Sequence, residues 1–489
     1  MSKRTAIIDI GSNSVSMVIY EKTSRFAFNL IYESKSRVRL CQDAYKNEAN
    51  LQKIPMQRTF DALSDYMKVI ASLKAKKTLC VATSALRDAP NKKEFLKKVS
   101  DKLGLKIKTI DGQREAYLGG IACANLLPTQ ENALTIDIGG GSTEFALINQ
   151  KNIKETISLN LGTVRLKELF FDNANAKEAI KYIDDKLQKL NAITSNKLVG
   201  IGGTTRALST AIMKEIEFPL IKLHAFESDA KRYKNFIDKV LVADEKELLK
   251  LGIKENRLDV IKPGALILQR VIKKLSISEM IVSGVGVREG LYLSDLLRNA
   301  KDKLPANYNT SVRNILDLYV DDKNYSNNLS KLSKILFNLL QDKLHLDAEH
   351  RASLSTSALL YPAGSSIHQF SLNKHSYYLL QSSLEYGFTQ KQIVLISTLV
   401  RYAKRKLPSQ THVDKYAVLL PKKEMLDALS YILSLSIALL SHRPRNIDFT
   451  LELKEDTLHI TTKDKFYLTQ EAVEALEPLK NISIKLLRV

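Results

Sequence analysis

The sequence predicts an α/β protein with two related halves, followed by a helical region and a small β-rich end. The duplication rests on two stretches of the same layout, AIIDIGSNSVSMVIY at 6–20 and ALTIDIGGGSTEFALI at 133–148. In each, an apolar run contains an aspartate near its end, a glycine turn with hydroxyl side chains follows, and a second apolar run returns. This pattern predicts a β-hairpin at the start of each half.

Alternating helix and strand patterns continue each hairpin into an α/β unit. In the first half, the expected elements are helix 58–74, strand 78–84, helix 91–99, strand 105–110 and helix 112–127. In the second half, they are helices 162–170 and 175–192, strand 197–203, strand 279–286 and helix 288–297.

Strand signals disappear after the second half, and helical patterns run from about 310 to 442. Short β-rich segments then close the chain. The predicted division is therefore lobe I at 1–125, lobe II at 126–302, a helical domain at 303–415 and a small α+β region at 416–489.

Composition indicates a cytoplasmic protein with no membrane partner. Cys41, Cys80 and Cys123 are widely spaced and form no CxxC motif, so neither a disulfide nor a zinc site is expected. The N-terminus does not resemble a signal peptide. The longest apolar stretch, 429–441, is short and serine-rich, which predicts a buried helix rather than a membrane span.

The net charge of +21 favours a polyanionic partner: nucleic acid, an anionic membrane or a phosphate polymer. A solvated lysine-rich surface is the alternative interpretation of the same charge. No recognisable nucleic-acid-binding module occurs, so nucleic acid is not an expected partner.

Both glycine turns have the residue types of a phosphate site. Glycine lacks a Cβ, so a ligand can approach the backbone, and successive N–H groups in a tight turn form a concave anion site. A plain hairpin turn is the alternative. The candidate phosphate-binding residues are Gly11, Ser12, Asn13 and Ser14 in the first turn, and Gly139, Gly140, Gly141, Ser142 and Thr143 in the second.

Acidic residues stand beside both turns. Asp9 and Asp137 lie at the ends of the outgoing strands, and Glu144 begins the second returning strand. A carboxylate repels phosphate directly but is useful when a magnesium ion or a water lies between them. The alternative is an aspartate that only stabilises the turn.

Two further glycine turns lead from strands into helices at 200–209 and 283–291. Backbone N–H groups at such helix starts face outward and favour anions. The candidate phosphate-binding residues of the first of these are Gly202, Gly203 and Thr204.

Seven segments occur in an order that closely resembles the exopolyphosphatase/guanosine pentaphosphate phosphohydrolase family. They are AIIDIGSNSVSMVIYE, ATSALRDAPN, GQREAYLGG, TIDIGGGSTEFAL, NLGTVRLKELF, GIGGTTRAL and VSGVGVREGL. The resemblance implies a duplicated, actin-like (ribonuclease H-like) fold with a cleft between its lobes. It also implies Mg²⁺-dependent release of terminal phosphate from polyphosphate, from guanosine pentaphosphate (pppGpp, giving ppGpp) or from both, in the bacterial stringent response.

The resemblance also assigns roles to residues of this chain. Glu115 matches the catalytic glutamate of the family, and Arg87 matches a phosphate-contacting arginine. Asp137 and Glu144 match its acidic metal- and water-handling positions. Asp9 and the first turn match the first phosphate site.

One position departs from the family pattern: Arg114 stands where many relatives have an acid. This change is expected to add positive charge near the cleft without displacing Glu115. The expected mechanism uses Glu115 to orient and deprotonate a water in line with the leaving oxygen. A phosphotransferase of the same fold and a sensor that binds guanosine tetra- or pentaphosphate remain alternatives.

Residues 310–410 are similar to the helical domain of longer family members, which is related to metal-dependent HD phosphohydrolases. The His-Asp doublet of that chemistry is replaced by Tyr361-Pro362, so the resemblance implies a degenerate metal site. An extended basic track for polyphosphate, an ordinary wet surface and a homodimer contact remain open for this domain.

Overall fold

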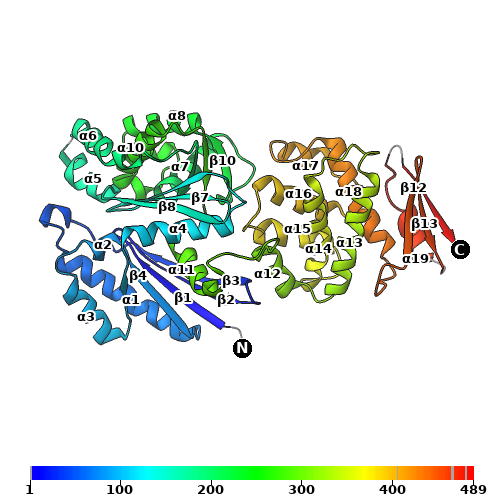
Figure 1. Cartoon of the computed structure of the whole chain (residues 1–489), viewed down its shortest axis with the longest axis horizontal. Coiled ribbons are helices and arrows are strands. Elements are labelled where there is room, and N and C mark those ends of the chain that lie inside the picture. The colour runs from blue at the N-terminus through cyan, green and yellow to red at the C-terminus, as the bar shows by residue number, and fades with distance from the viewer. Residues whose placement is uncertain (1–2, 174, 405, 464–466, 480–481, 489) are drawn as a thin grey trace. The chain divides into compact units, whose positions relative to one another are not determined.

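The structure is a computed structural model that describes residues 3–173, 175–404, 406–463, 467–479 and 482–488. The chain divides into two compact units, Met1–Tyr308 and Asn309–Val489. The first unit contains two sheets and the second unit contains one (Figure 1). Each unit also has buried hydrophobic clusters made of its own residues.

The first sheet has the strand order β3-β2-β1-β4-β5. Its central strand β1 is buried on both faces, because Ala6, Ile7 and Ile8 are fully inaccessible to solvent. β2 and β3 continue antiparallel on one side, whereas β4 and β5 run parallel on the other. The strands are β1 (Lys3–Ile10), β2 (Val15–Lys22), β3 (Phe28–Ser36), β4 (Lys77–Ala82) and β5 (Lys108–Thr109), and the helices that follow them are α1 (Lys53–Ser72), α2 (Ser84–Arg87) and α3 (Lys92–Leu103).

The second sheet has the order β10-β11-β9-β6-β7-β8. Its part β8-β7-β6-β9-β11 repeats the order and the strand directions of the first sheet, so the predicted duplication is present in three dimensions. The strands are β6 (Ala133–Ile138), β7 (Thr143–Asn149), β8 (Asn152–Leu159), β9 (Lys197–Ile201), β10 (Phe226–Asp229) and β11 (Glu279–Val282). The helices are α5 (Thr163–Leu169), α6 (Ala176–Lys186), α7 (Gly202–Glu215), α8 (Ala230–Val242), α9 (Glu245–Lys250) and α10 (Leu258–Lys274).

Two helices are exchanged between the sheets. α4 (Gly112–Leu126) follows the first sheet in sequence but packs on β7 and β8 of the second, whereas α11 (Val287–Leu296) follows the second sheet and contacts β1 of the first. The two helices also pack against each other (Figure 1). The predicted boundary after residue 125 therefore does not follow the packing, because by its contacts α4 belongs with the second sheet.

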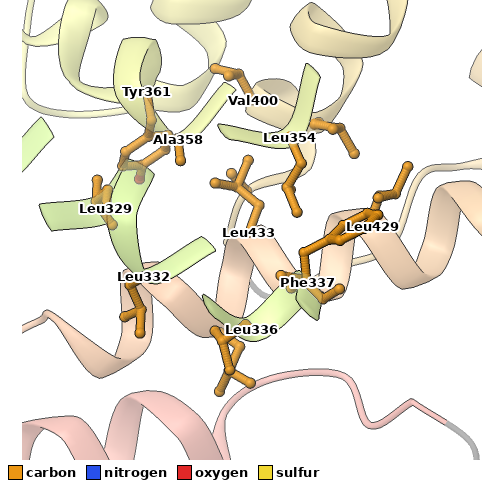
Figure 2. Close-up of a cluster of buried hydrophobic side chains, with 14 of the residues drawn as sticks. Leu329, Leu332, Leu336, Phe337, Leu354, Ala358, Tyr361, Val400, Leu429 and Leu433 are labelled. Carbon is orange, nitrogen blue, oxygen red and sulfur yellow. The ribbon is translucent and has the colours of Figure 1, made fainter. Parts of the chain in front are cut away.

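The second unit has one helical core that extends into its sheet. Leu336 and Phe337 of α13, Leu354 of α14 and Leu433 of α18 meet in this core (Figure 2). Leu458 of the terminal sheet belongs to the same cluster. The helices are α12 (Thr310–Tyr319), α13 (Lys323–Leu340), α14 (His350–Leu360), α15 (Leu372–Ser383), α16 (Gln390–Tyr402), α17 (Gln410–Lys415), α18 (Lys423–Leu439) and α19 (Tyr467–Glu474), and the strands are β12 (Phe449–Lys454), β13 (Thr457–Thr462) and β14 (Ser483–Arg488).

The packing of the second unit differs from the predicted boundaries at 303 and 416. Leu304 is buried in the first unit, where its N–H donates to Asn125 Oδ1 at 2.8 Å. α18 packs on α13, α14 and α16, so it belongs to the helical core rather than to a separate α+β region. Tyr361, from the replaced doublet, is buried in that core. In the described part of the chain, no helix has the length and apolar character needed to cross a membrane.

The α4–α11 contact provides a test of the exchanged packing. A Cβ added at Gly290 of α11 would lie 1.9 Å from the carbonyl oxygen of Leu118 in α4, whereas one at Gly119 would meet only the tip of Ile201 at 3.3 Å. Gly290→Ala should therefore lower the free energy of unfolding by about 1–3 kcal/mol or more. The matched variant Gly119→Ala should have a much smaller effect, because its neighbour can move and alanine favours a helix. Urea unfolding followed by circular dichroism measures both, and equal stability of the two variants would contradict this packing.

Candidate active site

The two glycine turns are closed by equivalent backbone hydrogen bonds. In the turn between β1 and β2, the N–H of Gly11 donates to the carbonyl of Ser14 at 3.1 Å. In the turn between β6 and β7, the N–H of Gly139 donates to the carbonyl of Ser142 at 2.9 Å. The similarity of the two sequences therefore extends to the hydrogen bond that closes each turn.

The turns also meet. A Cβ added at Gly140 would lie 2.6 Å from the Cβ of Ser12, and one at Gly141 would lie 2.8 Å from Ser84 Oγ. The Ser12 and Ser84 hydroxyl groups are themselves 3.0 Å apart. Glycine is required at these two positions because the backbone of the second turn lies directly against side chains of lobe I.

A cleft of about 670 Å³ opens at this junction. The N-terminal turns of α7 and α11 line it together with the glycine turns. It brings together most of the residues that the sequence predicts: Asp9, Gly11, Ser12, Asn13, Ser14, Glu115, Asp137, Gly139, Gly140, Gly202, Gly203 and Thr204. The lining, as far as the chain is described, does not include Arg87, Gly141, Ser142, Thr143 or Glu144.

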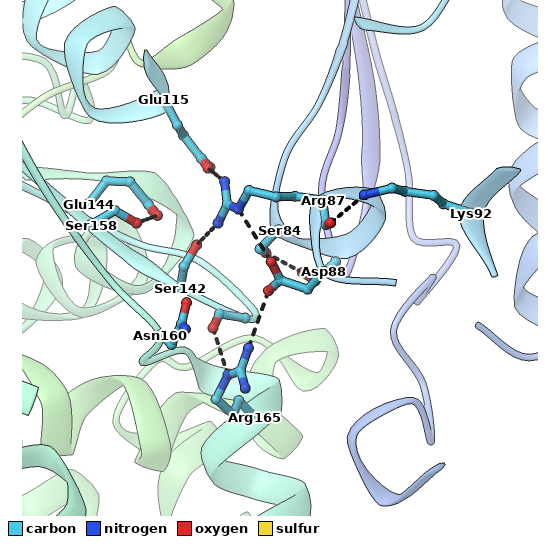
Figure 3. A network of polar contacts seen from close by, with 12 residues as sticks. Ser84, Arg87, Asp88, Lys92, Glu115, Ser142, Glu144, Ser158, Asn160 and Arg165 are labelled. Carbon is cyan, nitrogen blue, oxygen red and sulfur yellow. Dashed lines mark hydrogen bonds and ion pairs between the residues drawn. The ribbon is translucent and has the colours of Figure 1, made fainter. Parts of the chain in front are cut away.

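Glu115 lies in the first turn of α4, which Asp111 caps by accepting a hydrogen bond from the N–H of Arg114 at 2.7 Å. Arg87 holds the glutamate: its Nη1 donates to Glu115 Oε2 at 3.0 Å, and its Nη2 donates to Ser142 Oγ at 3.2 Å (Figure 3). The guanidinium thus links the candidate catalytic carboxylate of α4 to the second glycine turn.

Burial raises the pKa of Glu115 well above its usual value, and the nearby charge of Glu144 raises it further. The positive charge of Arg87 opposes this shift. A glutamate with a raised pKa accepts a proton at a pH closer to neutrality, as a general base requires.

Asp137 and Glu144 are direct partners across the antiparallel β6–β7 pair, so their side chains lie on the same face of the sheet. Glu144 Oε1 accepts a hydrogen bond from Ser158 at 2.9 Å, and burial raises the pKa of Glu144 to about 8. Burial also raises the pKa of Asp137. Asp137 lies against Gly202, whose φ is +78° and where a Cβ would approach Asp137 Oδ1 to 2.2 Å.

Asp9 lines the cleft from lobe I. Within the described residues, its buried Oδ1 has no hydrogen-bond partner. Burial raises the pKa of Asp9 to about 6; the charge of Asp137 adds to the rise, and Arg288 and Lys35 oppose it. Asp9 and Asp137 are both buried and repel each other, and Oδ1 of Asp9 lacks a hydrogen-bond partner among the described residues. Such a pair of carboxylates favours the binding of a proton or a cation.

Six cationic residues of the cleft lining were not predicted as site residues. Burial, followed by the charges of Arg257 and Arg288, lowers the pKa of Lys35 to about 8. Because Lys35, Arg257 and Arg288 repel one another, this part of the cleft favours the binding of a highly charged anion. Arg206 and Arg288 lie in the glycine-rich segments already recognised. The other four lie outside any motif: Lys35, Arg37, Lys254 and Arg257.

Arg114 and Thr143, which the sequence analysis expected at or near the cleft, are not part of its lining. Arg114 does not add its charge to the cleft lining; its Nη2 donates to Ser294 Oγ of α11 at 2.9 Å, and its guanidinium stacks on the Tyr117 ring. The Thr143 hydroxyl donates to the carbonyl of Leu161 instead of facing the cleft. Both side chains therefore stabilise packing between elements.

Two sheets of matching order, each contributing a glycine turn to a common cleft, form the two-lobed actin-like fold. The model of the Ppx/GppA phosphatase family matches residues 18–299, and the model of its domain III matches residues 309–481. The chain therefore belongs to the Ppx/GppA phosphatase family, a family of exopolyphosphatase and GppA hydrolases.

Two curated relatives differ in how much of the chain they match. A guanosine-5'-triphosphate,3'-diphosphate pyrophosphatase of Photobacterium profundum is 27% identical over 479 residues, which cover 93% of this chain and 91% of that protein. A bifunctional 3-dehydroquinate synthase/phosphatase of Fusobacterium nucleatum is 34% identical over 301 residues, which cover 57% of this chain. The chain spans only 44% of the length of that bifunctional relative.

Two solved structures each resemble about three fifths of this chain. The Aquifex aeolicus member of the Ppx/GppA family has a TM-score of 0.53 at 28% identity and covers 61% of this chain and 99% of its own. An exopolyphosphatase of Cytophaga hutchinsonii has a TM-score of 0.57 at 22% identity, covering 62% of this chain and all of its own, which shows the shared fold.

The raised pKa of Glu144 makes folding stability depend on pH. Between the ordinary value of 4.5 and about 8, the folded protein keeps a proton that the unfolded chain has lost. Glu144 therefore lowers the free energy of unfolding progressively as the pH rises through this window. The stability of Glu144→Gln relative to wild type should rise from about pH 5 to about pH 8 and then stay level.

Urea unfolding at a series of pH values measures this difference. The control is Glu94→Gln, which makes the same chemical change at an exposed position in α3. A stability difference that stays constant across the window for Glu144→Gln would contradict the assigned burial of this carboxylate.

Proposed function

We propose that the chain hydrolyses phosphoanhydride bonds, removing terminal phosphate from inorganic polyphosphate, from pppGpp (giving ppGpp) or from both. The observation that carries the proposal is the contact of the two glycine turns at a cleft that Glu115 also lines. Family membership supports the reaction class, and the cationic lining supports a highly charged substrate.

The two turns bind neighbouring phosphates of one substrate. Backbone N–H groups and the hydroxyl of Ser14 in the first turn serve one phosphate, and the Gly139–Gly140 backbone serves the next. The N-terminal N–H groups of α7, beginning at Gly202, provide further donors at the same cleft. Fixed donors of this kind stabilise the charge that develops on phosphate oxygens in the transition state.

Glu115 acts as the general base that orients and deprotonates the attacking water. Its position in the cleft lining and its raised pKa support this role. Arg87 holds the carboxylate through the Nη1–Oε2 contact of 3.0 Å and keeps it beside the second turn. Phosphoryl transfer requires little covalent help, so placing the water and neutralising charge are the main tasks of the protein.

The acidic residues fit a magnesium ion that phosphate helps to coordinate. In the described residues, no group of three or more His, Cys, Asp or Glu side chains is placed to hold a metal alone. Mg²⁺ commonly uses one or two carboxylates together with substrate phosphates and waters, and the unpaired Oδ1 of Asp9 is a suitable ligand. Asp137 with either Glu144 or Asp9 would hold the ion together with substrate phosphates and waters, and the ion would supply charge neutralisation to the transferred phosphate when bound.

Removing the proposed base should separate catalysis from binding. Glu115→Gln should lower kcat by about 10²–10⁴-fold, because the amide cannot accept the proton of water. Substrate affinity, measured by calorimetry with polyphosphate and with pppGpp, should change little. Glu94→Gln, on the exposed face of α3, is the matched control and should keep full turnover. Unaltered turnover in Glu115→Gln would refute the role of this residue.

Magnesium and substrate choice are tested together by following free phosphate from polyphosphate and from pppGpp. Release should stop when Mg²⁺ is chelated and return when it is added, because the acidic residues otherwise repel the substrate. The ratio of kcat/KM on the two substrates then defines the preference. Turnover that needs ADP and releases no phosphate would identify a phosphotransferase, and tight pppGpp binding without release would identify a sensor.

A further inference from the structure

A segment of lobe I, residues 39–47, is bonded to the backbone of the first glycine turn. We refer to it as the strap; it includes the 3₁₀ turn Tyr45–Asn47. The N–H of Arg39 donates to the carbonyl of Asn13 at 2.9 Å, and the N–H of Cys41 donates to the carbonyl of Ser12 at 3.0 Å. The strap therefore fixes the position of two successive peptide groups of that turn.

Helix α5 of lobe II holds the second turn in a comparable way. The N–H of Thr163 donates to the carbonyl of Gly139 at 2.9 Å, and the N–H of Val164 donates to the carbonyl of Gly140 at 2.8 Å. The side chain of Arg165 adds a bond from Nε to the carbonyl of Gly141, also at 2.9 Å (Figure 3). The position of the second turn thus depends on the position of α5.

Glu168 of α5 connects α5 to the strap through hydrogen bonds. Its two carboxylate oxygens accept hydrogen bonds from separate backbone N–H groups of the strap: Asp43 at 2.8 Å and Tyr45 at 3.0 Å. The Glu168 residue is only 6% exposed, so water competes little for these charge-assisted bonds. An unbroken series of hydrogen bonds then runs from the first turn through the strap, Glu168 and α5 to the second turn.

We infer that Glu168 is a positioning residue that sets the spacing between the two glycine turns. It acts through the strap and α5, and it is not among the residues that line the cleft. The inference rests on the proposed function, in which the turns bind neighbouring phosphates and their spacing must match that of the substrate. A small displacement of such groups lowers the rate strongly, because reacting atoms must be held in a narrow range of geometry.

A second contact at the same junction provides a control. Lys46 of the strap pairs with Asp172, which follows α5, at 2.9 Å, but the lysine side chain is 46% exposed. Exposed ion pairs of this kind contribute little to stability. Asp172→Asn therefore weakens this contact between the strap and the turn after α5, together with the Lys167–Asp172 pair at 2.6 Å, and leaves the buried bonds from Glu168 to the strap in place.

The experiment compares Glu168→Ala, Glu168→Gln and Asp172→Asn with wild type, using tripolyphosphate as substrate. Glu168→Ala should lower kcat/KM by about tenfold or more. Inhibition by orthophosphate should be unchanged, because a single phosphate needs only one turn. Glu168→Gln, which keeps one acceptor oxygen, should recover part of the loss, and Asp172→Asn should behave like wild type.

Hydrogen exchange gives a readout that does not depend on turnover. In Glu168→Ala, amides of the strap and of both glycine turns should exchange faster than in wild type. Unchanged exchange and kinetics would overturn the inference, as would an equal loss of orthophosphate inhibition and turnover. If Glu168→Ala does not fold, the same criteria apply to Glu168→Gln. Wild type that releases no phosphate from tripolyphosphate, from long-chain polyphosphate or from pppGpp would defeat the proposed function, while exchange would still decide the role of Glu168.

Discussion

The structure depends on the contact between two glycine turns that belong to different sheets. Gly140 can lie against Ser12 only because it has no side chain, and each turn sits at the same end of equivalent strands. The duplicated strand order brings these ends together, and the cleft opens where they meet. The absence of a side chain at Gly140 thus allows the two lobes to approach each other closely at this point.

Electrostatic strain accompanies this geometry. Burial raises the pKa values of Glu115 and Glu144, the charge of Glu144 raises that of Glu115 further, and Arg87 opposes both shifts only in part. Burial also raises the pKa of Asp9, and the charge of Asp137 adds to that rise. Burial and the charges of nearby arginines lower the pKa of Lys35, which also lines the cleft. Under the proposed function, a phosphate chain and a cation bound in the cleft would reduce the repulsion among the carboxylates and among the cationic side chains.

The sequence was sufficient for much of the fold, because the hairpins and the helix starts have local signatures. The β6 strand and its turn were recognisable from ALTIDIGGG alone, and the ordered family segments predicted Glu115, which lies in the cleft lining. The packing of the helices was harder to predict from the sequence. In sequence order α4 continues lobe I, and only long-range contacts show that it packs on the second sheet. Arg257 and Lys35 were missed for the same reason, since their role depends on distant segments folding to one cleft.

The exchanged helices make the two lobes inseparable. A polypeptide cut between them would leave one sheet without α11 and would leave α4 attached to a sheet that it does not cover. Each fragment would expose apolar surface that is dry in the intact chain, and such surfaces aggregate. Although the two halves share one strand plan, neither half contains all the helices that pack on its own sheet.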